Sequence, residues 1–340
     1  MRILRVDSTH PDPAALADAA AVLRGGGLVA FPTETVYGLG AHALDPAAVA
    51  RIYEAKGRPS YNPLIVHVAS IGEARGLASA WPEAADRLAE RFWPGPLTLV
   101  VPKSPEIPDA VSAGLDTVGV RIPAHPVAHA LLLAAGVPLA APSANRSMGV
   151  SPTTAEHVRR SLGGRVDVIV DGGPCPVGIE STVLSLAGEV PTVLRPGSIS
   201  IGELREVLGE VAAASAEPSG RAARPSPGML DRHYAPAAEV RLFSPAAREA
   251  TFAKAVWAAT DERRVGVIAF APVSASGAEV VAMPADVPGY AARLYAALHA
   301  MDAAGAEVIW IEQVPDAPEW AGVRDRLRRA ATGAAVLPGE

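Results

Sequence analysis

The stretch at residues 28–40, LVAFPTETVYGLG, decides how the first half of the chain is interpreted. Its apolar start, Leu28–Phe31, predicts a short buried strand, and the polar, glycine-rich segment Pro32–Gly40 follows it directly. The loop after a buried strand is a common binding place in α/β sheets. The segment also suits an ordinary strand-to-helix turn whose threonines bond local backbone. Taken alone, it leaves both interpretations open.

Helices and strands alternate on the two sides of this stretch. The helical spacing of Pro13–Arg24 ends at a run of glycines, and Asp45 is an N-cap residue for a helix that runs to Lys56 and stops at Gly57. We expect further helices at residues 83–92, 127–135, 154–162 and 202–208, and further strands at 97–101, 117–122, 137–141, 166–170, 182–186 and 192–194. This mixture predicts an α/β fold.

The second half of the chain begins with a change in composition. Residues 212–232 are rich in Ala, Ser, Pro and Gly and have no apolar period, which is typical of a linker. After them we expect strand 239–243, helix 246–259, strands 265–270 and 279–283, helix 289–301, strand 307–313 and helix 322–331. That order predicts a smaller, Rossmann-like parallel α/β domain. The expected parts are therefore a first domain at 1–210, a linker at 211–237 that carries PGM and HYAP segments, and a C-terminal domain at 238–340.

The composition narrows the class of protein. Of 340 residues, 49% are hydrophobic and 19% are charged, so a packed core is expected rather than disorder. A net charge of −6 argues against a nucleic-acid-binding surface over the whole chain. Cys175 is the single cysteine and cannot form an intramolecular disulfide, which favours a reducing, cytoplasmic compartment. The sequence has no run of about 18 apolar residues, so no membrane span is expected.

Two cations stand at the end of the second expected helix. Lys56 and Arg58 flank Gly57, so both heads are able to converge on one phosphate group, or they simply complement the dipole at the helix C-terminus. Asn62 follows, and then His67 on an apolar strand, where a histidine is more often a satisfied core residue than a ligand. The segment indicates either an anion site or a capped helix end.

Basic and polar residues also interrupt or follow later strands. Arg121 lies inside an apolar strand, where it would suit a ligand carboxylate if it faces a pocket, or would otherwise point outward. Ser143 and Asn145 follow the next strand and suit phosphate oxygens or hydrated Mg²⁺, although plain turn chemistry also explains them. Tyr234, in the expected linker, would either cover a site or dock two domains.

Several common signatures are absent from the sequence. Neither G-x-x-x-x-G-K-[ST] nor G-x-G-x-x-G occurs, which excludes a P-loop and a dinucleotide-binding fingerprint. H-E-x-x-H, paired cysteines and the G-x-S-x-G nucleophile elbow are also missing. A nucleotide would therefore have to bind by another architecture.

Together, these segments resemble the threonylcarbamoyl-AMP synthases, the YrdC-like family, in its long two-domain form. The motifs PTETVYGLG, KGRP, NPLIVH, WPGPLTLV, VGVRIP, APSAN, GIESTV and LRPG occur in family order and cover about residues 13–200. The PGM and HYAP segments and the small C-terminal domain extend the resemblance over essentially the whole chain. It implies a twisted mixed sheet with a concave, basic cavity, followed by the smaller parallel domain.

The resemblance also implies roles for individual residues. Those implied to be catalytic are Lys56, Arg58, Ser143 and Asn145. Those implied to contact ATP are Lys56, Arg58, Asn62, Thr117, Ser143, Ser151, Arg195 and Tyr234. Those implied to hold threonine are Thr35, His67, Arg121, Ser181 and the backbone near Ala141. Two positions depart from the family pattern, because Met148 stands where a glycine is usual and Leu230 where a lysine is frequent.

The activity that the resemblance implies is that of an L-threonylcarbamoyladenylate synthase, a nucleotidyltransferase. L-threonine, bicarbonate and ATP would give threonylcarbamoyl-AMP and pyrophosphate, for modification of tRNA next to the anticodon. Mg²⁺ would arrive with ATP and be held mainly by its phosphates, and the product would pass to tRNA threonylcarbamoyl transferase proteins.

Two other functions fit parts of the pattern. One is a module that binds double-stranded RNA or tRNA without catalysis, and weak tRNA binding would also be compatible with the enzyme. The other is carbamoyl transfer in hydrogenase maturation, which is disfavoured because this chain lacks the paired cysteines of the zinc-finger modules fused there.

Overall fold

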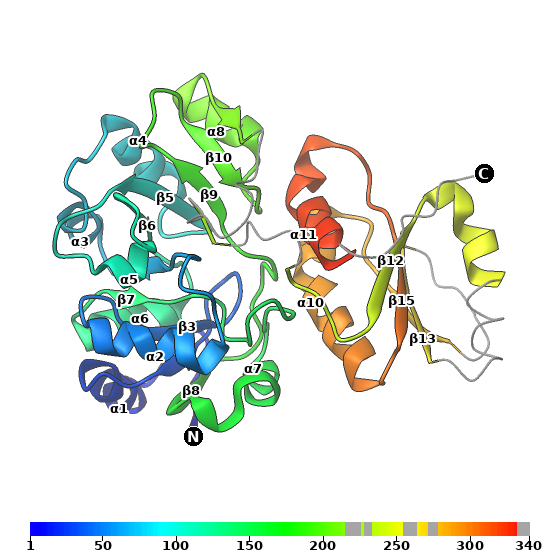
Figure 1. Cartoon of the computed structure of the whole chain (residues 1–340), viewed down its shortest axis with the longest axis horizontal. Helices are drawn as coiled ribbons and strands as arrows, with labels where there is room; N and C mark the ends of the chain where they lie inside the picture. The colour runs from blue at the N-terminus through cyan, green and yellow to red at the C-terminus, as the bar shows by residue number, and fades with distance from the viewer. Residues whose placement is uncertain (215–225, 228–232, 254–263, 271–277, 332–340) are drawn as a thin grey trace. The chain divides into compact units, whose positions relative to one another are not determined.

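The computed structural model describes residues 1–214, 226–227, 233–253, 264–270 and 278–331 (Figure 1). The chain divides into two compact units. The first comprises residues 1–147 and 151–229, and the second comprises residues 148–150 and 230–340. Sequence reasoning set the boundaries at 210 and 238, so the first unit takes in part of the expected linker, and three residues from the middle of the first domain group with the second unit.

The first unit is built on a large mixed sheet. Its strands are β1 (Arg2–Arg5), β2 (Val29–Phe31), β3 (Gly38–His42), β4 (Ile65–His67), β5 (Leu97–Pro102), β6 (Thr117–Arg121), β7 (Leu139–Ala140), β8 (Val168–Asp171), β9 (Thr182–Ser185), β10 (Thr192–Arg195) and β11 (Ala212–Ala213). Across the sheet their order is β1-β8-β2-β3-β7-β4-β6-β5-β9-β10-β11, with both parallel and antiparallel neighbours. The expected mixed α/β sheet is confirmed.

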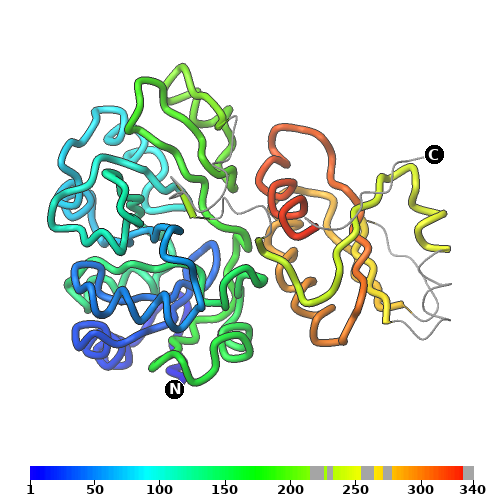
Figure 2. The backbone as a smooth tube through the Cα atoms, viewed as in Figure 1, coloured from blue at the N-terminus to red at the C-terminus, as the bar shows by residue number. Residues whose placement is uncertain are grey.

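Helices cover this sheet and pack against its two larger apolar clusters. They are α1 (Pro13–Arg24), α2 (Pro46–Lys56), α3 (Ile71–Gly76), α4 (Glu83–Phe92), α5 (Asp109–Ser112), α6 (Pro126–Ala135), α7 (Ala155–Leu162) and α8 (Ile201–Leu208), with a 3₁₀ turn at Gly163–Arg165. Helices α1 and α6 pack against each other through buried leucines, and α2, α4, α7 and α8 contribute to a second apolar cluster. Strand β1 pairs with β8 in parallel at the edge of the sheet, and Figure 2 shows the dark blue N-terminal end of the backbone next to a green segment.

The stretch at residues 28–40 forms a hairpin rather than a strand-to-helix turn. Strand β3 pairs antiparallel with β2, so Gly38 lies opposite Phe31 and Gly40 opposite Val29. A Cβ on Gly40 would come within 2.8 Å of the Phe31 ring, so only glycine lets β3 lie this close. Sequence reasoning missed β3 because glycine is rare in strands and predicts a loop.

The second unit contains a small parallel sheet. Its strands are β12 (Glu239–Phe243), β13 (Val265–Ala269), β14 (Glu279–Ala282) and β15 (Val308–Glu312), in the order β12-β15-β13-β14. Each adjacent pair is parallel, which confirms the expected parallel domain. Helices α10 (Val287–Ala303) and α11 (Ala321–Ala331) are accompanied by 3₁₀ turns at Pro245–Ala247 and Pro318–Trp320. The helix expected at 246–259 lies partly outside the described residues.

No helix among the described residues is both long enough and apolar enough to cross a membrane.

Candidate functional site

The expected site residues of the first unit gather around adjacent strands in the middle of its sheet. Strands β7, β4, β6, β5 and β9 are neighbours in that order. His67 on β4 lies opposite Arg121 on β6, and Thr98 on β5 lies opposite Val183 on β9. Residues that are distant in the sequence are therefore brought to one part of the sheet.

Arg121 is held on three sides and does not point outward. Its side chain is 4% exposed. Nε donates to the carbonyl of Gly95 (3.1 Å), Nη1 donates to Thr35 Oγ1 (3.0 Å), and Nη2 lies 2.6 Å from Glu34 Oε1 in an ion pair. Pairing with a carboxylate offsets the cost of burying an arginine, so the guanidinium is held in place next to Thr35.

His67 lies beside this cation and is neutral. Its ring is buried and meets Phe31 edge to face, with 6.4 Å between ring centroids. Burial, and to a smaller extent the charge of Arg121, lowers the pKa of His67 to about 3. No described residue forms a hydrogen bond with Nδ1. The imidazole therefore offers hydrogen bonding without charge.

Ser181 is fixed by a second arginine. Arg195 donates from Nη2 to Ser181 Oγ (3.0 Å) and from Nε to the Ser181 carbonyl (3.1 Å), while Ser181 Oγ lies 2.8 Å from Thr98 Oγ1. Arg195 Nη1 donates to the carbonyl of Pro227 (3.2 Å). A Cβ on Gly197 would lie 2.4 Å from the amide nitrogen of Thr182, so only glycine lets these two segments meet.

Lys56 and Arg58 reach backbone carbonyls rather than extending side by side into open space. Lys56 Nζ donates to the carbonyls of Ser143 and Asn145, and so fastens the loop after β7. Arg58 donates from Nε to the Asn62 carbonyl (3.1 Å) and from Nη2 to the Pro63 carbonyl (2.8 Å). The sequence left open an anion site or a capped helix end at these two cations, and in the structure both of them donate to carbonyls of neighbouring loops.

The C-terminal end of α2 determines where these two cations lie. Gly57 ends the helix with φ of 60°, in the left-handed region that glycine adopts without strain, and so turns Arg58 away from the helix axis. Burial, followed by the charge of Arg58, lowers the pKa of Lys56 well below its usual range, and Glu180 opposes this shift. The buried amine is thus held by its carbonyl partners and by a nearby carboxylate.

Two more polar side chains lie in the same region. Asn62 is fully buried, and neither its amide oxygen nor its amide nitrogen has a hydrogen-bond partner among the described residues. Ser151, also fully buried, donates to Glu180 Oε1 at 2.5 Å. A buried amide without a partner is costly, which makes Asn62 a strong candidate for ligand contact.

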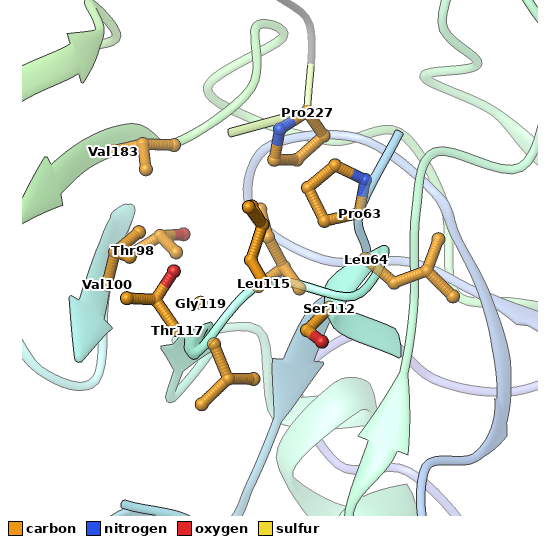
Figure 3. Close-up of a pocket in the computed structure, with 12 residues that line it drawn as sticks. Pro63, Leu64, Thr98, Val100, Ser112, Leu115, Thr117, Gly119, Val183 and Pro227 are labelled. Atoms are coloured by element: carbon orange, nitrogen blue, oxygen red, sulfur yellow. The ribbon is translucent and has the colours of Figure 1, made fainter. Parts of the chain in front are cut away.

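Thr117 and Gly119 help to form a small, mainly apolar cavity (Figure 3). Figure 3 shows Thr98, Thr117 and Val183 with Pro63 and Pro227 around the space. A Cβ at Gly119 would lie 3.3 Å from Thr98 Cγ2 and 3.4 Å from Ile65 Cγ1, so a larger residue here would crowd its neighbours and narrow the cavity. The residues that line the cavity are Pro63, Leu64, Ile65, Thr98, Val100, Ser112, Leu115, Thr117, Val118, Gly119, Val183 and Pro227.

Tyr234 belongs to the second unit. Its ring lies 5.1 Å from the guanidinium carbon of Arg326 and 5.9 Å from the ring of Tyr295, and its φ is 58°. Within this unit the Met148 carbonyl accepts a hydrogen bond from Ala235 N (3.0 Å). Met148 has φ of 70°, so the departure from glycine keeps the backbone shape that glycine favours. Leu230, the other departure, lies outside the described residues.

Sequence reasoning gave no role to four residues of this site. Glu34 pairs with Arg121, Glu180 holds Ser151, and Thr33 and Thr98 contact Thr35 and Ser181. All four stand inside or beside the quoted motifs. Their sequence neighbours are largely polar, so the burial of the two glutamates, and hence their need for a partner, becomes visible only in the fold.

Comparisons with known proteins address the identity of the family. The Sua5/YciO/YrdC model, described as telomere recombination, matches residues 21–197, and the model described as threonylcarbamoyl-AMP synthase, C-terminal domain, matches residues 199–332. The chain belongs to the threonylcarbamoyl-AMP synthase family. The resemblance noted in the sequence is confirmed.

Relatives of this family resemble the chain over nearly its full length. The threonylcarbamoyl-AMP synthase of Pyrococcus abyssi is 46% identical over 92% of this chain and 93% of its own. That of Bacillus subtilis is 43% identical over 94% of each chain. A crystal structure of Pyrococcus abyssi Sua5 complexed with L-threonine matches with a TM-score of 0.92 and 44% identity, over 97% of this chain and 98% of that chain.

Proposed function

We propose that this chain is an L-threonylcarbamoyladenylate synthase, which converts L-threonine, bicarbonate and ATP into threonylcarbamoyl-AMP and pyrophosphate. The family supports this activity. The observation that carries it is the arrangement of three buried side chains that their neighbours hold in place, near the loop that Lys56 fastens. They are Arg121 at the end of β6, Thr35 in the turn between β2 and β3, and Ser181 just before β9. A hydroxy-amino acid and a phosphate chain would thus be held close together.

The protein would recognise L-threonine by its charge and by hydrogen bonds. Arg121 would bind the carboxylate, and Thr35 and Ser181 would contact the hydroxyl. His67 would add a neutral hydrogen bond, because its low pKa keeps it uncharged. The amide of Ala141 already donates to the Ile65 carbonyl (2.9 Å), so Ala141 would offer its own carbonyl, an acceptor suited to the amino group.

The phosphates would lie against Arg58, Asn62, Ser143, Asn145 and Ser151. Lys56 would act mainly by holding the Ser143–Asn145 loop, since its amine already donates to two carbonyls of that loop. The family resemblance also assigns ATP contacts to Tyr234 and to Arg195, which donates to the carbonyl and the hydroxyl of Ser181.

The adenine would lie beside the small cavity of Figure 3, where Thr117 offers a hydroxyl. A larger side chain at position 119 would fill this cavity and disturb the surface next to the ring.

Mg²⁺ would arrive with the triphosphate. Within the described residues, no group of three His, Cys, Asp or Glu is placed to hold a metal ion. The donors on the loop next to Lys56 are the hydroxyl of Ser143 and the amide of Asn145, which suit an ion whose other ligands are phosphate oxygens and water. The bound ion would neutralise phosphate charge.

The reaction would need positioning and charge neutralisation but no covalent enzyme nucleophile. The amine of threonine attacks CO₂ derived from bicarbonate, and the resulting carbamate oxygen attacks the α-phosphorus of ATP as pyrophosphate leaves. Fixed cations and oriented hydroxyls favour such a displacement because they need no rearrangement during the reaction. The product would serve tRNA modification through downstream transferase proteins, and the cytoplasmic location stays a prediction from the single cysteine.

Release of pyrophosphate tests this activity. The assay would contain ATP and bicarbonate with L-threonine, L-serine or no amino acid. We expect release that depends on an amino acid and is fastest with threonine, and we expect Arg121→Gln to remove this dependence. Release at one rate in all three mixtures, or salt-dependent tRNA binding without any turnover, would instead favour the RNA-binding module.

A further inference from the structure

A cavity of about 570 Å³ lies in the second unit, and its volume is typical of a site for a small organic molecule. It is lined by Leu242 near the end of β12, by Gln313 and Val314 directly after β15, and by Asp316 and residues of the first turns of α11. All the residues that line it belong to the second unit. None of them is among the residues that the family resemblance assigns to threonine or ATP.

The cavity lies at the place in the parallel sheet where a ligand is expected. The chain runs from β12 to β13 and β14 and then returns to β15, which lies between β12 and β13. Strands β12 and β15 are parallel neighbours, with Leu242 opposite Ile311 and Phe243 opposite Glu312. Open α/β sheets bind ligands beyond the carboxyl ends of two such strands, where the order of the strands reverses. The topology and the cavity therefore indicate the same place.

Arg324, which lines the cavity, is held through one nitrogen of its guanidinium. Nη1 carries two hydrogens and donates to the carbonyls of Pro315 (2.8 Å) and Ala317 (2.7 Å), and it lies 3.1 Å from Asp316 Oδ1. Nε and Nη2 donate to no residue in the part of the chain that the structure describes. These two nitrogens form an edge that is able to bind both oxygens of a carboxylate at once.

The carboxylate of Asp325, also in the lining, is already held by other arginines of α11. Its side chain is 8% exposed, and it accepts hydrogen bonds from Arg326 Nη1 (2.9 Å) and from Arg329 Nε (2.9 Å). Arg328, four residues after Arg324 and on the same face of the helix, lies 3.6 Å from this carboxylate and is 66% exposed. Three arginines thus share one carboxylate, which leaves an excess of positive charge beside the cavity.

We propose that this cavity is a binding site for a small organic carboxylate. Arg324 binds the carboxylate through Nε and Nη2, while Val314 and Leu327 contact the apolar body of the ligand. Asp316 and Asp325 lie in the same lining, so a group with one negative charge is repelled less than a phosphate dianion. The inference goes beyond the proposed function, because it concerns the second unit alone.

Calorimetry and hydrogen exchange on the full chain, with three probes of similar shape, test this site. 4-Phenylbutanoate carries one negative charge, 4-phenylbutanamide carries none, and 3-phenylpropyl phosphate carries nearly two at neutral pH. We expect the amide to bind at least about tenfold more weakly than the acid, the effect of losing a charge-assisted hydrogen bond, and the phosphate also to bind more weakly than the acid. The bound acid should slow hydrogen exchange in peptides that span residues 313–328.

Two variants test the contact with the carboxylate. Arg324→Gln removes the edge that Nε and Nη2 form, so the acid should bind at least about tenfold more weakly. Arg160→Gln removes a surface arginine of α7 that pairs with Glu156 in the first unit, and it should leave the affinity for the acid unchanged.

Each outcome supports or overturns the proposal. Failure of the acid to bind, equal affinity for acid and amide, or slowed exchange only outside residues 313–328 would overturn the site. Tighter binding of the phosphate than of the carboxylate would overturn the class of ligand, and unchanged affinity in Arg324→Gln would overturn the role of that residue. If Arg324→Gln fails to fold, as judged by circular dichroism, the affinities and the exchange pattern of the wild type still decide.

Discussion

The ion pair between Glu34 and Arg121 is the residue-level feature on which the amino-acid end of the site depends. Its partners are 9% and 4% exposed, and the pair spans 2.6 Å. Removing one partner of a buried pair leaves an uncompensated charge, which costs about 3–5 kcal/mol. We therefore expect Glu34→Gln to lower the free energy of unfolding by an amount in that range, measured by urea denaturation.

Glu156→Gln is the matched control for this variant. Glu156 pairs with Arg159 and Arg160 on the surface, where such pairs contribute about 0–1 kcal/mol. Equal loss of stability in the two variants would contradict the view that Glu34 compensates a buried cation.

His67 makes a pH-dependent contribution at the same scale. Its pKa is about 3 in the folded chain and about 6.5 when exposed, so below about pH 6.5 the unfolded chain binds a proton that the folded chain does not. Stability from this group is fully present above that pH and falls by up to about 1.4 kcal/mol per pH unit as the pH is lowered towards 3. Denaturation at pH 7, 6 and 5 should show a shallower loss for His67→Asn than for the wild type, and parallel curves would refute the neutral, buried assignment.

At the scale of elements, the C-terminal end of α2 positions the loop that follows β7. Lys56 leaves the last turn of the helix and donates to the carbonyls of Ser143 and Asn145. We expect Lys56→Met to release this loop and to reduce turnover at least tenfold, about 1.4 kcal/mol of transition-state stabilisation. The measurement is the rate of pyrophosphate release at saturating threonine. Lys103→Met, which removes a lysine paired with Asp109 near the surface, should leave the rate unchanged, and equal effects would argue against the loop-holding role.

Residues of β4, β5, β6 and β9 line the small cavity of Figure 3, and Gly119 on β6 is one of them. A Cβ at Gly119 is already within 3.3 Å of Thr98, so Gly119→Val would fill the cavity of Figure 3. We expect affinity for ATP to fall about tenfold or more, since the larger side chain would disturb the surface next to the ring. Gly76→Val, where nothing lies within 4 Å of the added Cβ, is the control. Unchanged ATP affinity in Gly119→Val would place the adenine elsewhere.

At the scale of the whole molecule, the sequence predicted the class of fold, but it did not predict the order of the strands across the large sheet. Apolar runs and caps located most helices and strands, and the alternation after residue 238 predicted the parallel sheet of the second unit. Strand β3 was not predicted because its glycines are required only by the close approach of Phe31 on β2. The hydrophobic pattern of the sequence does not show this contact. The order of strands across the large sheet depends on long-range packing and was not predicted.

The same limit applies to the site. The motifs indicated Lys56, Arg58 and Arg121, but where each head points depends on which carbonyls and carboxylates the fold brings near it. Lys56 meets the loop after β7, and Arg121 meets Glu34, across long stretches of sequence.

The central claim is that a triphosphate and a hydroxy-amino acid lie side by side in the first unit, so that a carbamate is able to reach phosphorus. Incubation with ATP, L-threonine and ¹³C-labelled bicarbonate, followed by mass spectrometry of the nucleotides, tests it most directly. We expect a threonylcarbamoyl adenylate that carries the label and forms only when all three substrates are present. AMP and pyrophosphate without any labelled adduct, even in early time points, would contradict it.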